Sequence, residues 1–312
     1  MFNQEIKEKY LATREGVSAG RARGLFEASQ DLEISLGKDL AEFSVSELGE
    51  FMGQGGFSEP DSIRTKQAAI AKYSDWYCSY HPTTKHNIRD FDLKDFPYAK
   101  YFAATVTKTP EDLVNRITQV YDVDSAQPAI PTLCFAWLGL ESADAAALRK
   151  EQVDTFHGKI YDMTGNVVVA QMPDIIREVL DVYGKTYTAI RTQNQTFMVY
   201  ADDIGFFIKR MKSQNSEKVS KPLSNKQLVA YIRNMQDLYQ DAFGKEAGIW
   251  LNYTNVQRSG NFYRLHQMAK SGVDVYSTKN ADKVRLCLGP SKRNHKDNML
   301  MYNAYLEVIG EK

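Results

Sequence analysis

Cysteine is scarce in this chain, and no two cysteines lie close together in the sequence. The 312 residues contain three, Cys78, Cys134 and Cys287, and no Cys-x-x-Cys pair. An odd number of widely separated cysteines argues against a disulfide framework and against a structural zinc site. We therefore expect reduced, buried thiols, and the sequence predicts neither a metal site nor a cofactor.

Long hydrophobic runs are also missing. There is no stretch of about 18 consecutive apolar residues, and the N-terminus, MFNQEIKEKYLATREG, lacks the apolar core of a signal peptide. We therefore expect a cytoplasmic protein with no membrane partner. Because 43% of the 312 residues are apolar, the chain can bury two cores of roughly 100–200 residues each. One small and one larger domain are expected.

The chain has no net charge, yet its charges are unevenly distributed. Residues 1–204 hold 21 Lys and Arg against 30 Asp and Glu, whereas residues 205–312 hold 18 against 9. Basic side chains gain affinity for a polyanion by displacing the counterions condensed on its phosphates. The basic C-terminal third therefore fits a polyanionic partner, although an ordinary solvated surface has the same composition.

The N-terminal third is predicted to be helical. Residues 1–40 have apolar residues three to four positions apart, which predicts a partly exposed helical arm. Residues 41–105 predict a small helical domain, in which Pro60 opens the main helix and Ile63 and Tyr73 lie on its apolar face. The opposite face of this helix is polar.

Residues 106–312 combine helices with one group of short strands. PAIPTLCFAWLGL predicts a buried helix, and Val and Ile cluster between turn residues in 153–173, which predicts a small sheet. Ser224 and Gln227 form a capping-box pattern that starts a long helix, and Gly244 ends it. The predicted fold class is therefore mostly α with a small β-sheet, an α+β chain.

The segment most informative about chemistry is GLESADAAALRKEQVD, residues 139–154. Its order of Gly-Leu, an acid, Leu-Arg and Val-Asp resembles the first box of the tyrosine recombinase (phage integrase) family. That family usually places an arginine directly after Gly-Leu, where this chain has Glu141. The resemblance thus implies that a residue which would clamp a scissile phosphate is replaced by a carboxylate that repels one.

Two later segments resemble the second and third boxes of the same family. The second box is a His-x-x-Arg pair before a helix that ends in Gly-Val-Asp, and registering that ending puts Arg258 at the histidine and Asn261 at the arginine. The third is a Leu-Gly-His turn followed by a nucleophilic tyrosine. Pro290 takes the place of its histidine, and Tyr302 and Tyr305 lie near the nucleophile's position.

The resemblance covers roughly residues 40–310. It implies a SAM-like, core-binding-like domain at 41–105 and a degenerate recombinase catalytic-like domain at 106–312. Attack on a phosphodiester needs preorganised cationic donors, and loss of one typically costs a factor of about 10²–10³ in rate. Because several donors are replaced, we expect no catalytic residues and no enzyme activity. Glu141 would then be able to pair with a cation inside the protein, and Arg258 is the candidate.

The function that the resemblance implies is a sequence-specific, double-stranded DNA-binding transcriptional repressor. The chain looks like the integrase-like lysogeny repressors of SPβ-type Bacillus prophages. Double-stranded DNA is the expected partner, and a regulatory peptide or protein antagonist is a further candidate. The residues expected to contact DNA are Arg64, Thr65, Lys66, Asn225, Lys226, Arg258 and Arg264. For the residues on the polar helix face, a solvated surface is the alternative.

Two other functions are compatible with the sequence. A divergent but active recombinase would recruit Arg258, Lys159 or His295 into a shifted phosphate site and use Tyr302 or Tyr305 as nucleophile. A protein-interaction module would instead use the former phosphate pocket to bind a peptide or an acidic partner. Trapping of a covalent DNA adduct would identify the first, and absence of DNA binding at low salt would favour the second.

Overall fold

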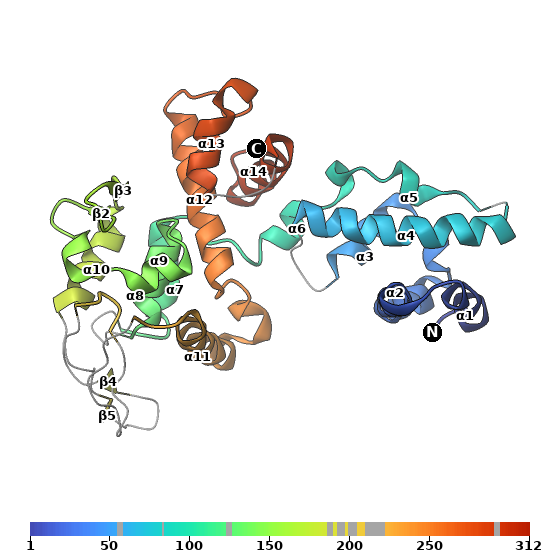
Figure 1. Cartoon of the computed structure of the whole chain (residues 1–312), viewed down its shortest axis with the longest axis horizontal. Helices are drawn as coiled ribbons and strands as arrows, with labels where there is room; N and C mark the ends of the chain where they lie inside the picture. The colour runs from blue at the N-terminus through green and yellow to red at the C-terminus, as the bar shows by residue number, and fades with distance from the viewer. Residues whose placement is uncertain are drawn as a thin grey trace. The chain divides into compact units, whose positions relative to one another are not determined.

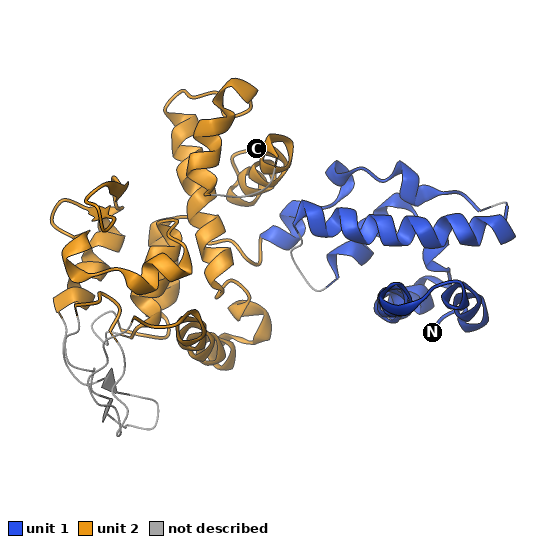
Figure 2. Cartoon of the chain, in the orientation of Figure 1, with its two compact units in different colours: residues 1–102 blue, residues 103–312 orange. Residues whose placement is uncertain are grey.

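The chain forms two compact units, residues 1–102 and residues 103–312 (Figures 1 and 2). No helix among the described residues combines the length and the apolar character needed to cross a membrane. The computed structural model describes residues 1–54, 59–82, 84–122, 127–185, 190–191, 197–198, 205–209, 222–289 and 294–312.

The first unit is helical wherever it has regular structure. Ser44 caps α3 by accepting a hydrogen bond from the Glu47 amide. Pro60 occupies the first turn of α4, as the sequence predicts. Its elements are α1 (Gln4–Ala12), α2 (Gly16–Leu36), η1 (Leu40–Glu42), α3 (Val45–Gly53), α4 (Pro60–Tyr80), α5 (Asn87–Asp90), η2 (Leu93–Asp95) and α6 (Tyr98–Phe102).

The first 40 residues belong to the core of this unit. Tyr10 of α1 and Phe26 of α2 meet Tyr73 of α4 edge to face, with ring centroids 5.1 and 4.7 Å from the Tyr73 ring. All three side chains are buried. We expected a partly exposed arm at 1–40, but this aromatic cluster joins α1 and α2 to α4 within one unit. The apolar residues three to four positions apart in this segment form the helix faces that pack against α4.

The second unit contains more elements than the first and all described strands. Its elements are α7 (Pro110–Thr118), α8 (Ala129–Trp137), α9 (Ser142–Ala147), η4 (Lys150–Gln152), β1 (Val153–Asp154), β2 (Lys159–Tyr161), β3 (Val167–Val169), α10 (Asp174–Lys185), β4 (Ile190–Arg191), β5 (Phe197–Met198), α11 (Asn225–Phe243), η5 (Lys245–Gly248), α12 (Tyr253–Lys270), η6 (Thr278–Asn280), α13 (Ala281–Leu288) and α14 (His295–Ile309).

Helix α8 is the centre of the second unit, since every residue from Ala129 to Trp137 is buried. Helix α12 runs alongside it, with α14 beyond (Figure 1). The two backbones approach so closely that a Cβ at Gly260 of α12 would lie 1.9 Å from the Trp137 carbonyl oxygen. Glycine is therefore the residue that permits this crossing, and the crossing fixes α12 against the segment that follows α8.

The predicted small sheet is present. Strands β1, β2 and β3 form an antiparallel sheet in that order, with Val153 opposite Ile160 and Ile160 opposite Val169. Ile160 is buried, which anchors the sheet to the core. The fold class of mostly α with a small β-sheet is thus confirmed. The predicted capping box at Ser224 and the end of α11 at Gly244 are also present.

Candidate functional site

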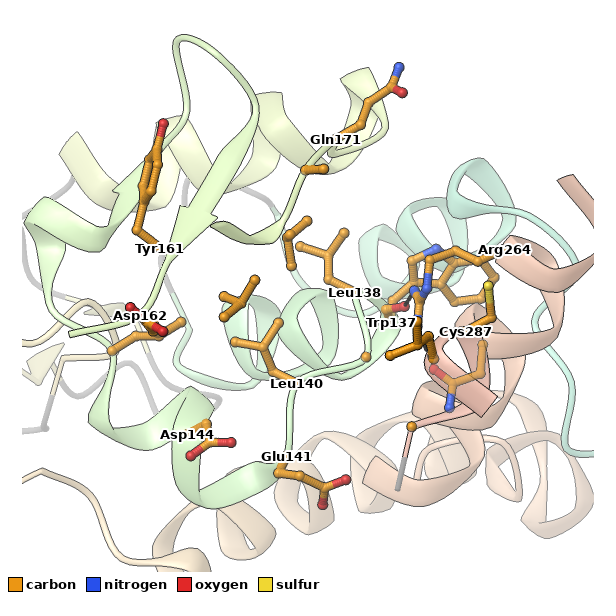
Figure 3. Close-up of a pocket in the computed structure, with 18 of the residues that line it drawn as sticks. Trp137, Leu138, Leu140, Glu141, Asp144, Tyr161, Asp162, Gln171, Arg264 and Cys287 are labelled. Atoms are coloured by element: carbon orange, nitrogen blue, oxygen red, sulfur yellow. Dashed lines mark hydrogen bonds between the residues drawn. The ribbon is translucent and has the colours of Figure 1, made fainter. Parts of the chain in front are cut away.

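The segment Gly139–Asp154 borders a cavity of about 1100 Å³ in the second unit. Its walls are the end of α8 and the turn into α9, strands β2 and β3, and the facing sides of α12 and α13 (Figure 3). Two positions that the sequence motifs single out, Glu141 and Asn261, line it together with Arg264. The structure therefore brings the first and second boxes to one place, as the family pattern requires.

Glu141 lies at the start of α9 on the rim of the cavity. Its side chain is exposed, and its Oε1 accepts a hydrogen bond from Gln257 Nε2 at 3.3 Å. The internal ion pair with Arg258 that the sequence suggested is absent between these two described residues, since the described partner of Glu141 is an amide. The carboxylate therefore remains available to whatever enters the cavity.

Asn261 and Arg264 form a hydrogen-bonded pair on α12. Asn261 Nδ2 donates to the Leu288 carbonyl at 2.9 Å, and its Oδ1 accepts from Arg264 Nη2. Arg264 Nη1 donates to the Trp137 carbonyl oxygen. Burial lowers the pKa of Arg264 to about 10, so the guanidinium stays protonated at neutral pH. Its positive charge is held by two neutral acceptors.

Gly139 makes room for this arrangement. Its φ is +92°, a conformation that L residues with a Cβ rarely adopt, and a Cβ there would lie 2.3 Å from Arg264 Nη2. The Gly-Leu pair of the first box thus has a structural reason in this chain: the glycine turns the backbone out of α8 and leaves space for the guanidinium.

Arg258 lies one turn before Asn261 on α12, and it is buried, with 8% of its surface exposed. Its Nη1 donates to Asn255 Oδ1 at 3.2 Å. It is not among the residues that line the cavity. The third-box position Pro290 lies outside the described residues, whereas Leu288 and Gly289 before it are described.

The two candidate tyrosine nucleophiles lie on α14, packed against α12. Tyr302 and Tyr305 stack on Phe262, with ring centroids 6.4 and 5.9 Å from its ring. The Tyr302 hydroxyl is 3.0 Å from His266 Nδ1, and the Tyr305 hydroxyl donates to the Lys108 carbonyl at 3.2 Å. Burial raises the pKa of Tyr302 to about 12 and raises that of Tyr305 as well. Neither lines the cavity.

The other two residues considered for a shifted phosphate site are also separate from it. Lys159 begins β2 and lies opposite Asp154 of β1. His295 begins α14, and its Nε2 lies 3.0 Å from the Tyr276 carbonyl oxygen. Neither is among the described residues of the cavity wall. The structure thus gathers Glu141, Asn261 and Arg264, and it leaves the other candidates elsewhere.

The predicted DNA-contact residues of the first unit lie in the first turns of α4. Arg64 Nη1 pairs with Asp61 at 2.8 Å, and the exposed Thr65 donates its hydroxyl to the Asp61 carbonyl. Lys66 differs from both: its ammonium donates to the Met52 carbonyl at 2.7 Å, and burial lowers its pKa. Lys66 therefore also holds α4 against the end of α3.

The predicted contact residues of α11 lie at its N-terminus. Asn225 and Lys226 are exposed and follow the Ser224 cap, so they stand at the positive end of the helix dipole. With Arg233 and three further residues of α11 they border a shallow depression of about 270 Å³. Asn225, Lys226 and Arg233 give this surface hydrogen-bonding and cationic character, which is chemistry suited to phosphate oxygens.

Comparison with known proteins gives three kinds of match. Residues 1–79 match the family model described as MrpR, N-terminal core-binding domain. The SPbeta prophage-derived uncharacterized protein YopR of Bacillus subtilis (strain 168) is 23% identical over 285 residues, which cover 86% of this chain and 83% of that protein.

Solved structures of the Tn1549 transposon integrase also align with the chain. The complex with transposon right end DNA is 13% identical, covers 96% of this chain and 93% of its own, and has a TM-score of 0.36. The complex with circular intermediate DNA is 12% identical, with coverages of 95% and 93% and a TM-score of 0.36.

The match to the MrpR core-binding domain begins at residue 1 and continues to residue 79. It therefore includes α1 and α2 with α3 and most of α4, consistent with the shared aromatic core of the first unit. The chain thus resembles the MrpR core-binding domain over residues 1–79 and the prophage-derived protein YopR over most of its length, as the sequence motifs led us to suspect.

Proposed function

We propose that this chain is a sequence-specific, double-stranded DNA-binding repressor of the prophage lysogeny type, built on a recombinase-like fold that no longer transfers strands. The observation that carries the proposal is the identity of two residues that line the cavity. An exposed carboxylate, Glu141, and a hydrogen-bonded amide, Asn261, stand where the family pattern has two arginines. The MrpR-type N-terminal segment and the similarity to YopR support it.

The chemistry of strand cleavage explains why these replacements argue against an enzyme. Each preorganised donor to the transition state contributes about 10²–10³ in rate, and a carboxylate at 141 repels the phosphate that such donors would hold. The amide nitrogen of Asn261 is committed to the Leu288 carbonyl. A tyrosine nucleophile needs a deprotonated oxygen, whereas burial raises the pKa of Tyr302 to about 12.

The proposed DNA-contacting surface has one part in each unit. In the first unit it includes Arg64 and Thr65 at the start of α4, and in the second Asn225 and Lys226 at the start of α11. Contacts of this kind to phosphates position a protein on the duplex, and base-edge contacts then select the sequence. We also retain Lys66, Arg258 and Arg264 as proposed contacts. Because these three side chains make contacts inside the protein, their substitution is expected to affect folding as well as affinity.

A binding experiment tests the DNA-binding part of the proposal. Selection from a pool of random duplexes with the full chain should enrich one sequence, and the affinity for it should fall with rising salt. Lys226→Ala should weaken binding and reduce the slope of log affinity against log salt by about 0.9, the value of one phosphate contact. Lys245→Ala is the matched control, since Lys245 is exposed in η5 beyond the other end of α11. No enrichment, or equal slopes for both variants, would contradict the proposal.

A trapping experiment tests the loss of strand transfer. The selected duplex is given a nick near its centre, so that an active recombinase would lose its leaving fragment and remain covalently attached. We expect no adduct with the wild-type chain, and none with Tyr302→Phe or Tyr305→Phe. An adduct that disappears in one of these variants would establish the chain as an enzyme.

A further inference from the structure

The cavity beside Glu141 has the size and lining of a binding site for something other than phosphate. Its volume of about 1100 Å³ is slightly above the range typical of small-molecule pockets, roughly 300–1,000 Å³. Apolar side chains from three directions form most of its lining, including Leu138 and Leu140 after α8 and Val169 of β3 (Figure 3). An occupant must therefore offer a substantial apolar surface.

The rim of the cavity is negatively charged. Among its described lining residues, three carboxylates, Glu141, Asp144 and Asp162, face one guanidinium, that of Arg264. Arg264 directs hydrogen bonds to the Trp137 carbonyl and to Asn261, on the inner wall. Glu141 and Asp144 are exposed, and Asp162 is half-buried. The balance disfavours a nucleic acid backbone here and favours a cationic occupant.

One of these carboxylates is fixed as an anion by its own turn. Asp162 Oδ1 accepts hydrogen bonds from the amide and hydroxyl of Thr164 and from the amide of Asn166, all at 2.7–2.9 Å. The side-chain hydrogen bonds from Thr164 and Asn166 lower the pKa of Asp162 to about 2. The negative charge at the sheet side of the rim is therefore permanent at physiological pH.

Large apolar side chains are exposed at the same rim. Leu286 of α13 is 84% exposed, Met163 after β2 is 73% exposed, and Val168 of β3 is 54% exposed. All three line the cavity. Exposed apolar groups that are contiguous with a lined cavity and bordered by charges mark interaction sites.

We propose that this cavity is the docking site for a segment of a partner protein that presents apolar side chains flanked by Lys or Arg. The apolar side chains enter between β3 and α13 and cover Leu286 and Val168, and the basic groups meet Glu141, Asp144 and Asp162. Glu141, which stands where the family pattern has a phosphate-binding arginine, thereby becomes a contact for the basic groups of the partner. This site does not depend on the proposed DNA binding.

A peptide selection tests the proposal with the full-length chain. Random twelve-residue peptides displayed on phage are selected against it, and the winners are synthesised with a fluorophore and measured by anisotropy. We expect winners with two or more apolar residues adjacent to Lys or Arg. Peptides that are acidic or uncharged, or a selection that yields no binder tighter than about 100 μM, roughly −5.5 kcal/mol, would overturn the proposal.

Substitutions of exposed residues then show where on the chain the winning peptides bind. Glu141→Gln with Asp144→Asn should weaken binding about five- to tenfold, and Leu286→Gln about tenfold. Asp237→Asn with Asp241→Asn, on exposed positions of α11, is the matched control and should leave affinity unchanged. If the winning peptides bind the cavity variants and the control equally well, they dock elsewhere and the proposal is wrong.

The cavity variants should keep their affinity for the selected duplex. If the wild-type chain binds no DNA, that result contradicts the proposed function and leaves the proposed docking site untouched.

Discussion

The two units of this chain each enclose a cation, and they compensate it differently. In the first unit, the ammonium of Lys7 is fully buried and pairs with the equally buried carboxylate of Glu33. In the second, the guanidinium of Arg264 donates to a backbone carbonyl and to the amide oxygen of Asn261. Both sites satisfy a cation with hydrogen bonds, but the first also neutralises its charge.

The two cations also differ in what surrounds them. Glu33 also accepts from Ser29 Oγ at 2.9 Å and from the Leu40 amide at 2.7 Å, so the pair joins α1, α2 and η1 in a closed network. Arg264 instead lies in the wall of a cavity whose carboxylates are on the opposite rim. The first arrangement holds helices together. The second leaves an electrostatic field in a space that a ligand can enter.

The largest effect is expected when the closed network loses its anion. Glu33→Ala leaves the Lys7 ammonium buried without a counter-charge, and breaking a buried pair from one side costs about 3–5 kcal/mol. Urea denaturation followed by circular dichroism should show the loss. The double variant Lys7→Met with Glu33→Leu should recover most of it, because two apolar groups of similar size remove both charges.

An exposed pair gives the control for that experiment. Lys9 and Glu5 are both on the surface of α1 and pair at 2.8 Å, so Glu5→Ala should leave the free energy of unfolding almost unchanged. If Glu33→Ala were as mild as Glu5→Ala, the network around Glu33 would not hold the helices together, and the contrast between the two units would fail.

The next effect concerns the crossing that supports Arg264. Gly260→Ala places a methyl group against the Trp137 carbonyl, the same oxygen that accepts from Arg264. The atom in the way is a backbone oxygen, which cannot move aside as the end of a flexible side chain can. We therefore expect the free energy of unfolding to fall by about 3 kcal/mol, the upper end of the usual cost of overpacking. The measurement is again urea denaturation.

A second helical glycine controls for helix propensity. A Cβ at Gly24 of α2 would meet nothing within 4 Å, so Gly24→Ala should stabilise the chain by up to about 1 kcal/mol. Equal effects of the two alanines would show that α8 and α12 do not meet as closely as described.

A smaller loss is expected for Arg264 itself. Arg264→Met removes the donors to the Trp137 carbonyl and to Asn261, and unsatisfied buried acceptors cost about 1–3 kcal/mol. We expect about 2 kcal/mol by denaturation, below the cost of Glu33→Ala, since no charge is left uncompensated. Arg233→Met, on the exposed face of α11, should be close to neutral. A cost for Arg264→Met equal to that of Glu33→Ala would remove the distinction between the two sites.

The sequence predicts the elements of this fold better than it predicts these buried charges. Pro60, Ser224 and Gly244 begin or end their helices where local chemistry requires it. The burial of α8 follows from its apolar composition. These signals are local, so they survive without knowledge of the tertiary structure.

The buried charges depend on contacts between distant segments. The Lys7–Glu33 pair joins residues 26 positions apart, yet a signal existed: Lys7 precedes Tyr10 and Leu11 by three and four positions and so shares their apolar face. For Arg264 no such signal was present, because its acceptors lie at residue 137 and on the same helix. The role of Arg264 as a DNA contact stays a proposal. Glu141 and Asn261 line one cavity, and in the sequence only the resemblance to the family pattern grouped them, since periodicity carries no such tertiary information.

The smallest effect tests the permanent charge at the cavity rim. Asp162 has a pKa lowered to about 2 by Thr164 and Asn166. A carboxyl whose pKa is lower when folded stabilises the fold at any pH above its ordinary value of 3.8, and that contribution is lost as the pH falls through about 2. Carboxyl ¹³C chemical shifts followed by NMR from pH 6 downward should therefore show Asp162 still mostly ionised at pH 3. Asn166→Ala removes the amide donor to Oδ2, so its Asp162 should titrate closer to pH 3.8. An Asp162 that is already protonated at pH 3 in the wild-type chain would mean that the rim is held as an anion no more firmly than any surface carboxylate. Arg264, with a pKa of about 10, would then be the one of these two cavity residues whose charge the fold keeps over a wide pH range.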